Sequence, residues 1–150
     1  MVIQISRAEL DIANELTTLA HDAKRNWGYS NALIALWRTE LTFTPKYIAR
    51  TPIYIAKVKQ RTVGVYALGG SAPECELDHL WVRPDSHGHG VGRALFNHAI
   101  STARECGAAR IKIVSDPNAE DFYKKLGAHR IASVAARPKG RRLPVLRFNM

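Results

Sequence analysis

LDHLWVRPDSHGHGVGRALFNHAIST, residues 77–102, decides the fold of this chain. The pattern predicts a half-buried strand, a glycine loop and an amphipathic helix, in that order. Gly88, Gly90 and Gly92 let consecutive backbone N–H groups approach a ligand closely. The helix that follows adds its unpaired amides and the positive end of its dipole. The stretch therefore predicts a binding site for phosphate groups at the start of the helix.

Two common phosphate-binding loops do not fit this spacing. A Walker A loop ends in Gly-Lys-Ser or Gly-Lys-Thr, whereas Gly92 is followed by Arg93 and Ala94. A dinucleotide-binding loop has the pattern GxGxxG, whereas the segment HGHGVG at 87–92 reads GxGxG. The remaining interpretation is a pyrophosphate loop of a third kind.

This loop resembles the acetyl-CoA signature of the GNAT N-acetyltransferases, which is usually written Q/R-x-x-G-x-G/A. The glycines match, and His87 stands where the family usually has Gln or Arg. A second segment, DPNAEDFYKKLGA at 116–128, is similar to the family's strand-end loop and short helix. Its tyrosine stands at the position that, in the family, lies near the cofactor thiol. The segment's short helix is followed by a glycine, as in the family. The resemblance covers roughly residues 50 to 130.

The resemblance implies an enzyme, an acetyl-CoA-dependent N-acetyltransferase. Such an acyltransferase moves an acetyl group to a primary amine of a small molecule or protein, by direct attack in a ternary complex. The resemblance also implies that acetyl-CoA contacts a strand end, the glycine loop and the second segment. The implied residues are Leu80, Trp81, Val82, His87, Gly88, His89, Gly90, Val91, Gly92, Arg93, Asn118 and Tyr123.

The predicted elements follow the order of the GNAT fold, β-α-α-β-β-β-α-β-α-β-β, in the α/β class with a mixed sheet and helices on both faces. The sheet is expected to be mostly antiparallel, with one parallel pair formed across a helical connection. The predicted strands are 2–5, 53–57, 62–68, 76–82, 111–114, 130–134 and 143–149. The predicted helices are one opened by a Ser6–Glu9 capping box, one from Ser30 to about Glu40, Gly90–Cys106 and Ala119–Leu126.

Two carboxylates are the candidate general bases. Alternation in strand 76–82 predicts that Glu76 and Asp78 share one face, with His79 on the other. Asp78 falls where many relatives carry a base, and Glu76 can share or replace that role. Because an aspartate has a reference pKa of about 3.9, this base needs burial or a water relay. Alternatively, the carboxylates only bind water or an arginine, and His79 is the base if a bulge changes the parity.

Tyr123 is the predicted acid that protonates the departing thiolate, because its position matches the family tyrosine near the sulfur. The alternative is a core aromatic residue beside Phe122. Asn118 is expected to hydrogen-bond the cofactor. Asp116 and Pro117 are expected to start a helix, as its cap and its first residue.

Two aromatic residues are the candidate acceptor contacts. Trp27 and Tyr29 lie between the first two predicted helices, where relatives form one wall of the acceptor pocket, although they can equally fill the core. The pair His87 and His89 is not predicted to bind a metal ion, because no third ligand is near in sequence.

The composition favours one globular enzyme domain over residues 1–150. Hydrophobic residues make up 46% and charged residues 23% of the chain, as in ordinary globular proteins. No apolar run approaches the ~20 residues of a membrane span, and the start of the chain does not match a signal peptide. Cys75 and Cys106 are isolated, which disfavours a disulfide or a zinc site. Cytoplasmic residence is the default expectation.

The net charge of +9 admits several anionic partners. The phosphates of coenzyme A are a sufficient use for a basic rim. A second hypothesis is a catalytically inactive GNAT-like basic module that binds RNA or a protein. A DNA-binding helix-turn-helix at 7–40 is disfavoured because its second helix is largely apolar. The sequence leaves open the amine acceptor and whether the chain is a homodimer.

Overall fold

The computed structural model describes all residues, 1–150. Two compact units are present: one contains residues 1–67 and 79–98, and the other contains residues 68–78 and 99–150. The expectation of one domain over 1–150 stays a prediction.

The first unit contains a three-stranded antiparallel arrangement. Strand β1 (Gln4–Arg7) pairs with β2 (Ile53–Val58), and β2 pairs with the first part of β3 (Arg61–Ser71). The β2–β3 hairpin turns at Lys59 and Gln60, which have φ of 50° and 67°. Strands β2 and β3 confirm the predicted strands at 53–57 and 62–68. The first strand begins two residues later than predicted.

The helices of the first unit differ from the sequence prediction at their starts. A 3₁₀ turn, η1 (Leu10–Ile12), leads into α1 (Ala13–Arg25). The predicted capping box is wrong: Ser6 belongs to β1, and neither helix start has a side-chain cap. Leu10 is half exposed, because it lies in the 3₁₀ turn before the amphipathic helix begins.

Hydroxyl caps start the next two helices. Ser30 accepts a hydrogen bond from the backbone N–H of Leu33 at 3.2 Å and opens α2 (Asn31–Leu36), as predicted, although α2 ends four residues early. The sequence analysis missed α3 (Pro45–Arg50), whose cap Thr44 accepts from Tyr47 N–H at 3.1 Å. Pro45 favours a first turn because its missing N–H needs no partner there, so it starts a helix instead of breaking one.

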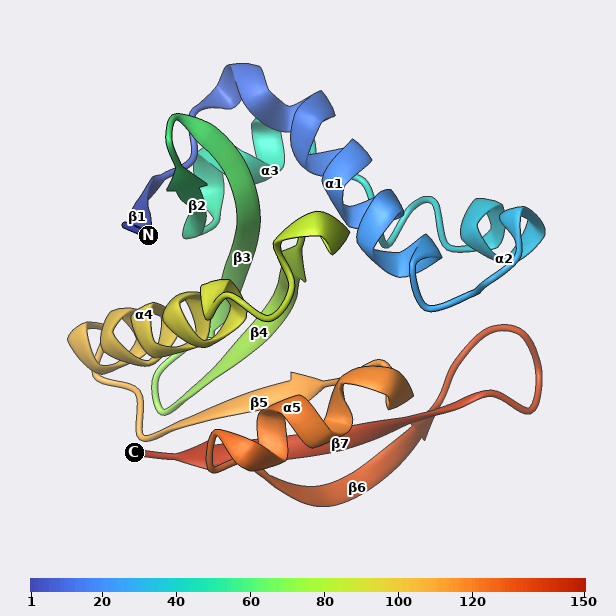
Figure 1. The fold of residues 1–150 in the computed structure, drawn as a ribbon. Coiled ribbons are helices and arrows are strands. Elements are labelled where there is room, and N and C mark those ends of the chain that lie inside the picture. Colours follow the sequence, from blue (N-terminus) through green and yellow to red (C-terminus); the bar gives the residue numbers. More distant parts are fainter. The chain divides into compact units, whose positions relative to one another are not determined.

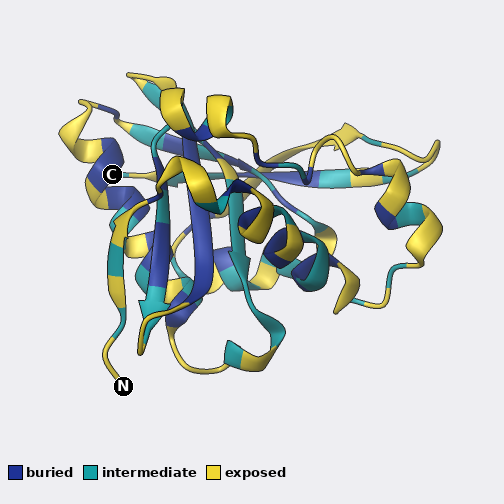
Figure 2. Ribbon diagram, turned by 90° about the horizontal axis from the view of Figure 1, so that it is seen from above, coloured by how far each residue is buried: buried dark blue, intermediate teal, exposed yellow.

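The core of the first unit is formed by side chains from these helices and its strands. Figure 2 shows the buried residues of the chain in dark blue. The members of this core are apolar side chains that are almost completely buried. They include Leu16, Leu19 and Ala20 of α1, Ile34 and Trp37 around the end of α2, Phe43 and Ile48 at α3, and Ile53, Ile55 and Val65 of the hairpin.

The second unit contains the parallel pair of the sheet. The first part of β4 (Glu74–Val82) pairs in parallel with β5 (Arg110–Val114), through Glu74–Arg110, Cys75–Ile111 and Glu76–Lys112. Strand β7 (Arg142–Asn149) is antiparallel both to β5 and to β6 (His129–Ala135). The predicted parallel pair is confirmed. Strand β3 extends through Gly69 and Gly70 beyond the predicted strand at 62–68, and β4 begins at Glu74, two residues earlier than predicted.

Two helices follow the glycine loop and β5. Helix α4 (Val91–Glu105) agrees with the prediction to within a residue at each end, but Cys106 beyond it is exposed instead of buried. A 3₁₀ turn, η3 (Pro117–Ala119), leads into α5 (Glu120–Lys125), which lies along β7 and β6 (Figure 1). Both cysteines are free thiols.

The seven strands follow the order β1-β2-β3-β4-β5-β7-β6 in a mixed α/β sheet. The order of helices and strands agrees with the predicted GNAT order once α3 and the short 3₁₀ turns are added. No helix is long and apolar enough to cross a bilayer.

Candidate active site

The glycine loop has an open backbone at the start of α4. Gly88 and Gly90 have φ of 80° and 81°, in the left-handed region that favours glycine. A Cβ atom added at either position meets no protein atom within 4 Å, so packing does not require these glycines. The first amides of a helix have no intrahelical acceptor, and those of α4 follow directly. The loop therefore fits a ligand with phosphate groups, as the sequence predicted.

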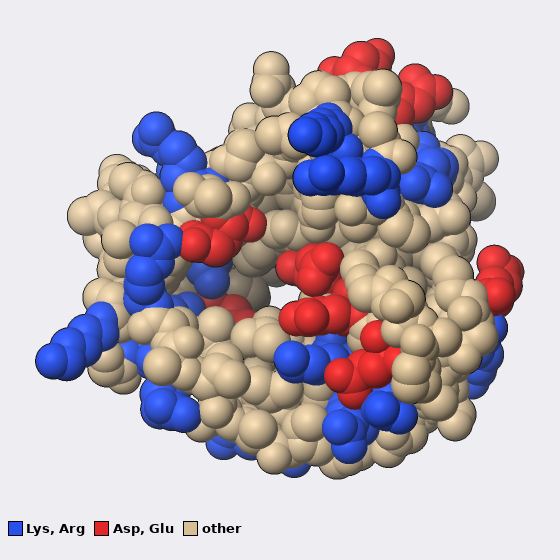
Figure 3. All heavy atoms as spheres, turned by 180° about the vertical axis from the view of Figure 1, so that it is seen from behind, with Lys and Arg blue, Asp and Glu red and all other residues tan.

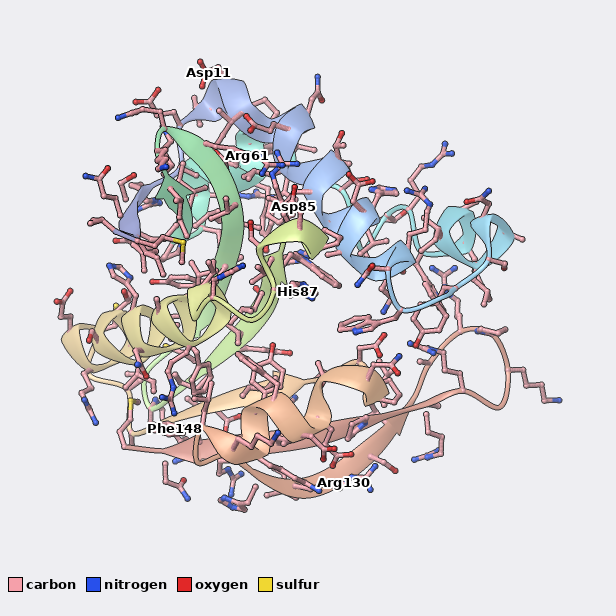
Figure 4. The ribbon with its side chains drawn as sticks, viewed as in Figure 1. Asp11, Arg61, Asp85, His87, Arg130 and Phe148 are labelled. Atoms are coloured by element: carbon pink, nitrogen blue, oxygen red, sulfur yellow. The ribbon has the colours of Figure 1, made fainter.

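Side-chain contacts hold the segment before this loop. The Arg61 guanidinium donates to the Asp85 carboxylate at 2.8 Å, which joins the β2–β3 turn to the short helix η2 (Pro84–Ser86) (Figure 4). That hydrogen bond lowers the pKa of Asp85. His87 Nε2 lies 3.1 Å from the carbonyl oxygen of Val82, and since a carbonyl only accepts, this nitrogen donates. His87 therefore ties the loop to the end of β4.

A hollow of about 290 Å³ borders the loop. Its lining includes the predicted cofactor residues His89 and Val91 and two basic residues of the hairpin, Lys59 in the turn and Arg61 at the start of β3. Both positive charges suit an anionic ligand. Neither Lys59 nor Arg61 was among the predicted cofactor contacts.

Close packing sets the end of β4 next to the glycine loop. A Cβ atom added to Gly64 of β3 would lie 3.0 Å from the Trp81 carbonyl oxygen and 2.8 Å from the Leu95 side chain of α4. The glycine thus permits the close approach of β3, β4 and α4. The three predicted pantetheine contacts on β4, Leu80, Trp81 and Val82, are each half-buried.

The candidate base Asp78 lies in a partly desolvated position on β4. Its carboxylate lies against Gly69 of β3, and a Cβ atom added to that glycine would be 3.2 Å from the carboxylate carbon. Asp78 is exposed as a whole residue, yet desolvation of its carboxylate, aided by the nearby Glu76 charge, raises the pKa of Asp78 to about 6. This value meets the condition that the sequence analysis set for a carboxylate base.

His79 lies among aromatic rings instead. Its ring centroid is 4.7 Å from that of Phe43 and 6.0 Å from that of Tyr47. The Trp81 indole N–H donates to His79 Nδ1 at 2.9 Å, so one lone pair is already used. Burial lowers the pKa of His79 to about 4, and the ring is therefore neutral at pH 7. Because His79 and Trp81 meet, they share one face of β4, as the alternation predicted.

Tyr123 is the buried residue of α5, with 6% of its surface exposed. The sequence analysis had placed it beside the buried face, but Phe122 is the less buried of the two and packs edge-on against it at 5.0 Å. Burial raises the pKa of the Tyr123 phenol, and the negative charge of Asp116 raises it further. The phenol is therefore protonated at any ordinary pH.

Asp116 organises the loop before α5. One carboxylate oxygen accepts from Asn118 N–H at 2.8 Å and from its side-chain amide at 2.9 Å, which confirms Asp116 as a helix cap. The other forms an ion pair with Arg141 at 3.2 Å, with side-chain exposures of 4% for Asp116 and 15% for Arg141. The sequence analysis missed Arg141, because an arginine in a run of basic residues carries no signal for one distant partner.

The aromatic residues of the predicted acceptor wall lie after α1. Trp27 and Tyr29 are half-buried, and Tyr29 packs edge-on against Trp37 with ring centroids 4.9 Å apart. Tyr29 also packs against the core of the first unit. Both interpretations of these residues, as a pocket wall and as core, thus remain consistent with their burial.

The surface charges are mixed, and no cluster of metal-binding side chains is present. Lys and Arg atoms occupy several separate places on the face in Figure 3, with Asp and Glu atoms between them. No three His, Cys, Asp or Glu side chains gather where they could hold a metal ion.

Known proteins resemble the chain in sequence and in structure. A family model described as an acetyltransferase (GNAT) domain matches residues 15–140. The peptidyl-lysine N-acetyltransferase YjaB of Escherichia coli (strain K12) is 33% identical over 134 residues, which are 85% of this chain and 82% of that protein. Its apo structure in solution superposes with a TM-score of 0.70 at 25% identity and covers 98% of this chain and 96% of its own.

A more distant relative supports the fold alone. The crystal structure of a PaiA N-acetyltransferase from Thermoplasma acidophilum, in complex with coenzyme A, superposes with a TM-score of 0.82 over 100% of both chains. Its identity to this chain is 17%.

Proposed function

Because this chain belongs to the GNAT acetyltransferase family, we propose that its acceptor is the side-chain amine of a lysine in a protein or peptide. The family membership makes the chain an N-acetyltransferase that takes its acetyl group from acetyl-CoA. The acceptor is the finer proposal. It is carried by one observation, the 33% identity to a peptidyl-lysine N-acetyltransferase over most of both chains.

The glycine loop supports a role in holding acetyl-CoA. Positive φ at Gly88 and Gly90, with open space beside both, leaves the amides from Gly88 to Arg93 free for the pyrophosphate. We assign the backbone of Leu80 to Val82 to the pantetheine arm and Asn118 to a further hydrogen bond. His87 acts mainly by fixing the loop to Val82.

Asp78 is the proposed general base. The acceptor reaches the enzyme as an ammonium ion, because a lysine has a reference pKa of about 10.4. Asp78 accepts one proton from it, directly or through a water molecule, and its pKa of about 6 leaves it mostly ionised at pH 7. Glu76 is the proposed neighbour that shares this proton through water. His79 is less suited, since it is neutral with one nitrogen already bound.

Acetyl-CoA supplies an acetyl group activated as a thioester. The amine nitrogen attacks the carbonyl carbon, the C–N bond forms, and the C–S bond breaks. The sulfur leaves with the electron pair of that bond and then takes up a proton. The attacking nitrogen loses its second proton as the amide forms, and this proton returns through water to the group that protonated the sulfur. We assign the donation of a hydrogen bond, and then of a proton, to the Tyr123 phenol. Its raised pKa keeps the phenol protonated, so it enters every turnover as a hydrogen-bond donor to the sulfur, although the same raised pKa makes it a weaker acid.

The non-catalytic hypothesis has less support than this enzyme. A module that only binds RNA or a protein has no need for an open glycine loop, a protonated buried phenol and a carboxylate with a raised pKa in one chain. Strong binding of nucleic acid that persists at saturating acetyl-CoA, without thiol release from any amine, would favour the module.

A lysine-peptide assay tests the acceptor. The substrate is a short N-acetylated peptide with one lysine, and the controls carry Nε,Nε-dimethyl-lysine or alanine at that position. Free lysine and polyamines form a second panel. We expect thiol release and a mass gain of one acetyl group on the lysine peptide alone. Turnover of the small amines without turnover of any lysine peptide would overturn the acceptor but leave the acetyltransferase assignment intact.

A further inference from the structure

An ammonium group of the protein itself lies inside an aromatic cage in the first unit. Lys24, in the last turn of α1, is only 9% exposed. Four rings surround its Nζ atom, and these four rings are called the aromatic cage below. The distances from Nζ to the ring centroids are 4.7 Å for Trp37, 5.2 Å for Tyr29, 5.8 Å for Trp27 and 5.9 Å for Trp81.

The cage joins three separate segments of the chain. Trp27 and Tyr29 follow α1, Trp37 is the residue at the end of α2, and Trp81 belongs to β4. The centroids of Trp27 and Trp81 are 6.2 Å apart at an interplanar angle of 53°. Trp81 also donates its indole N–H to His79, next to the proposed base in β4. The cation thus lies where the predicted acceptor wall meets β4.

The neighbouring residue Arg25 shows how a basic side chain at the end of this helix can stay in solvent instead of being buried. Arg25 extends into solvent and pairs with Asp22 one turn earlier, with both side chains nearly half exposed. A lysine at the end of a helix can do the same, and a buried ammonium loses much of its hydration. Aromatic faces attract a cation through the ring quadrupole, and they do so most strongly where water is excluded. Lys24 therefore has a specific reason to point inward.

We propose that the aromatic cage is an alkylammonium-binding site occupied by Lys24, and that Lys24 is a positioning residue that holds the acceptor wall against β4. The statement about the wall rests on the proposed function, because only an acetyltransferase needs the acceptor wall that the sequence analysis predicted at Trp27 and Tyr29. The assignment of the cage as a binding site for an alkylammonium group does not depend on the proposed function. Since the occupant is tethered, the site is filled in every molecule, and the acceptor enters beside the cage and not into it.

Three variants distinguish the effect of the Lys24 charge from the effect of its side-chain packing. Lys24→Met keeps the length and the apolar stem but removes the charge, and Lys24→Ala empties the cage. Arg25→Met is the matched control, because it removes one neighbouring charge outside the cage. The first measurement is the near-ultraviolet circular dichroism of the tryptophans, which reports ring geometry without any substrate. We expect a changed spectrum in both Lys24 variants and an unchanged one in Arg25→Met.

Chemical rescue identifies the site as one for ammonium. Tetramethylammonium has no N–H group and cannot be acetylated, yet aromatic cages bind such ions. We expect it to restore the tryptophan spectrum and the melting temperature of Lys24→Ala, with no effect on the wild-type chain. Neutral tert-butanol at the same concentration serves as the size control and should restore neither. Equal effects of the two compounds, or of neither, overturn the cage.

Kinetics test the positioning role with the best acceptor of the amine and peptide panels. We expect KM for the acceptor to rise by about fivefold or more in Lys24→Met, while KM for acetyl-CoA changes by less than about twofold. Tetramethylammonium should reverse the rise in Lys24→Ala. An unchanged acceptor KM in both Lys24 variants overturns the positioning role. If no peptide is acetylated, the proposed acceptor fails, while the spectroscopic experiment still decides the cage.

Discussion

The carboxylate of Asp78 lies directly over the backbone of Gly69, on the neighbouring strand β3. Any side chain at position 69 would occupy the space that the carboxylate uses. Gly69 is half-buried and has no positive φ, so the backbone itself does not demand glycine. The space for Asp78 is therefore the physical reason for glycine at this position, and it connects a strand glycine to the proposed base.

Gly69→Ala is expected to displace the base without removing it. The added methyl group collides with the end of the Asp78 side chain, which can rotate away, so the melting temperature should change little. A misplaced catalytic group costs rate, and we expect kcat/KM to fall roughly 10- to 100-fold. The same substitution in an Asp78→Asn background should cost almost nothing more. Additive losses in the double variant would show that Gly69 acts independently of Asp78.

The pH dependence of kcat/KM should carry an acid limb from Asp78. The base must be ionised, and its pKa is about 6, so the rate should fall as the pH drops through about 6. Asp78→Asn should lower the plateau and remove this limb. Glu76→Gln should shift the limb to lower pH, because the Glu76 charge contributes to the raised pKa. A limb that persists in Asp78→Asn and disappears in His79→Gln would reverse the assignment of the base.

The Asp78 carboxylate should also make the stability of the fold depend on pH. Ionisation of Asp78 should raise the rate but lower the free energy of unfolding. The pKa of Asp78 is higher in the folded chain than in the unfolded one, so the folded state binds more protons between the two values. Its contribution to stability is therefore lost as the pH rises through about 6. At pH 7.5, Asp78→Asn should unfold at a slightly higher urea concentration than the wild-type chain, and this difference should vanish near pH 4.

Local patterns in the sequence predicted the glycine loop, its helix and the alternation in β4, because each depends on neighbouring residues. Ser30 as a cap and Asp116 as a cap were likewise readable, since a cap and its helix are adjacent. The contacts that give these elements their chemistry are distant in sequence. Gly69 meets Asp78, and Lys24 meets Trp81, only once the strands and helices pack. No spacing rule connects such pairs.

The errors at helix starts also have physical causes. Ser6 and Glu9 have the spacing of a capping box, but pairing of β1 with β2 includes Ser6 in a strand. The prediction contains no helix at 45–50, although Thr44 supplies the cap of one and Pro45 its first residue. At Ser6, pairing between distant strands therefore outweighed the local helix signal. At Thr44 and Pro45, the helix start follows from a local cap that the prediction did not include.

Tyr123→Phe tests the proposed acid. The substitution removes one oxygen from a buried ring and keeps its packing, so kcat should fall by roughly 10- to 100-fold. The affinity for acetyl-CoA, measured by calorimetry, should change little, because the proton donor acts after binding. Unchanged turnover together with a lower melting temperature would make Tyr123 a core residue only.

Gly90→Glu is expected to abolish acetyl-CoA binding, because it adds bulk and negative charge at the proposed phosphate site. Gly107→Glu is the matched control at the other end of α4. Both glycines are exposed, have φ near +80°, and have no protein atom within 4 Å of an added Cβ atom. Backbone strain of about 1 kcal/mol is therefore common to both variants. The thermal shift caused by acetyl-CoA should disappear in the first and persist in the second. Equal shifts in both would remove the loop from the binding site.

A double-mutant cycle on Asp116 and Arg141 tests the ion pair before α5. Both side chains are largely buried, so removal of either partner leaves an uncompensated charge and should cost about 3 kcal/mol of unfolding free energy. Asp116→Asn retains an oxygen that can accept from Asn118 N–H, so its loss reports the charge more than the cap. Asp116→Asn with Arg141→Gln should cost less than the sum of the single variants, by about 1–3 kcal/mol. Because Asp116 raises the pKa of Tyr123, its removal should also lower the pH at which the phenol ionises, as measured by phenolate absorbance. Strict additivity in urea unfolding would mean that the two side chains do not stabilise each other, and the loop before α5 would then depend on the cap alone.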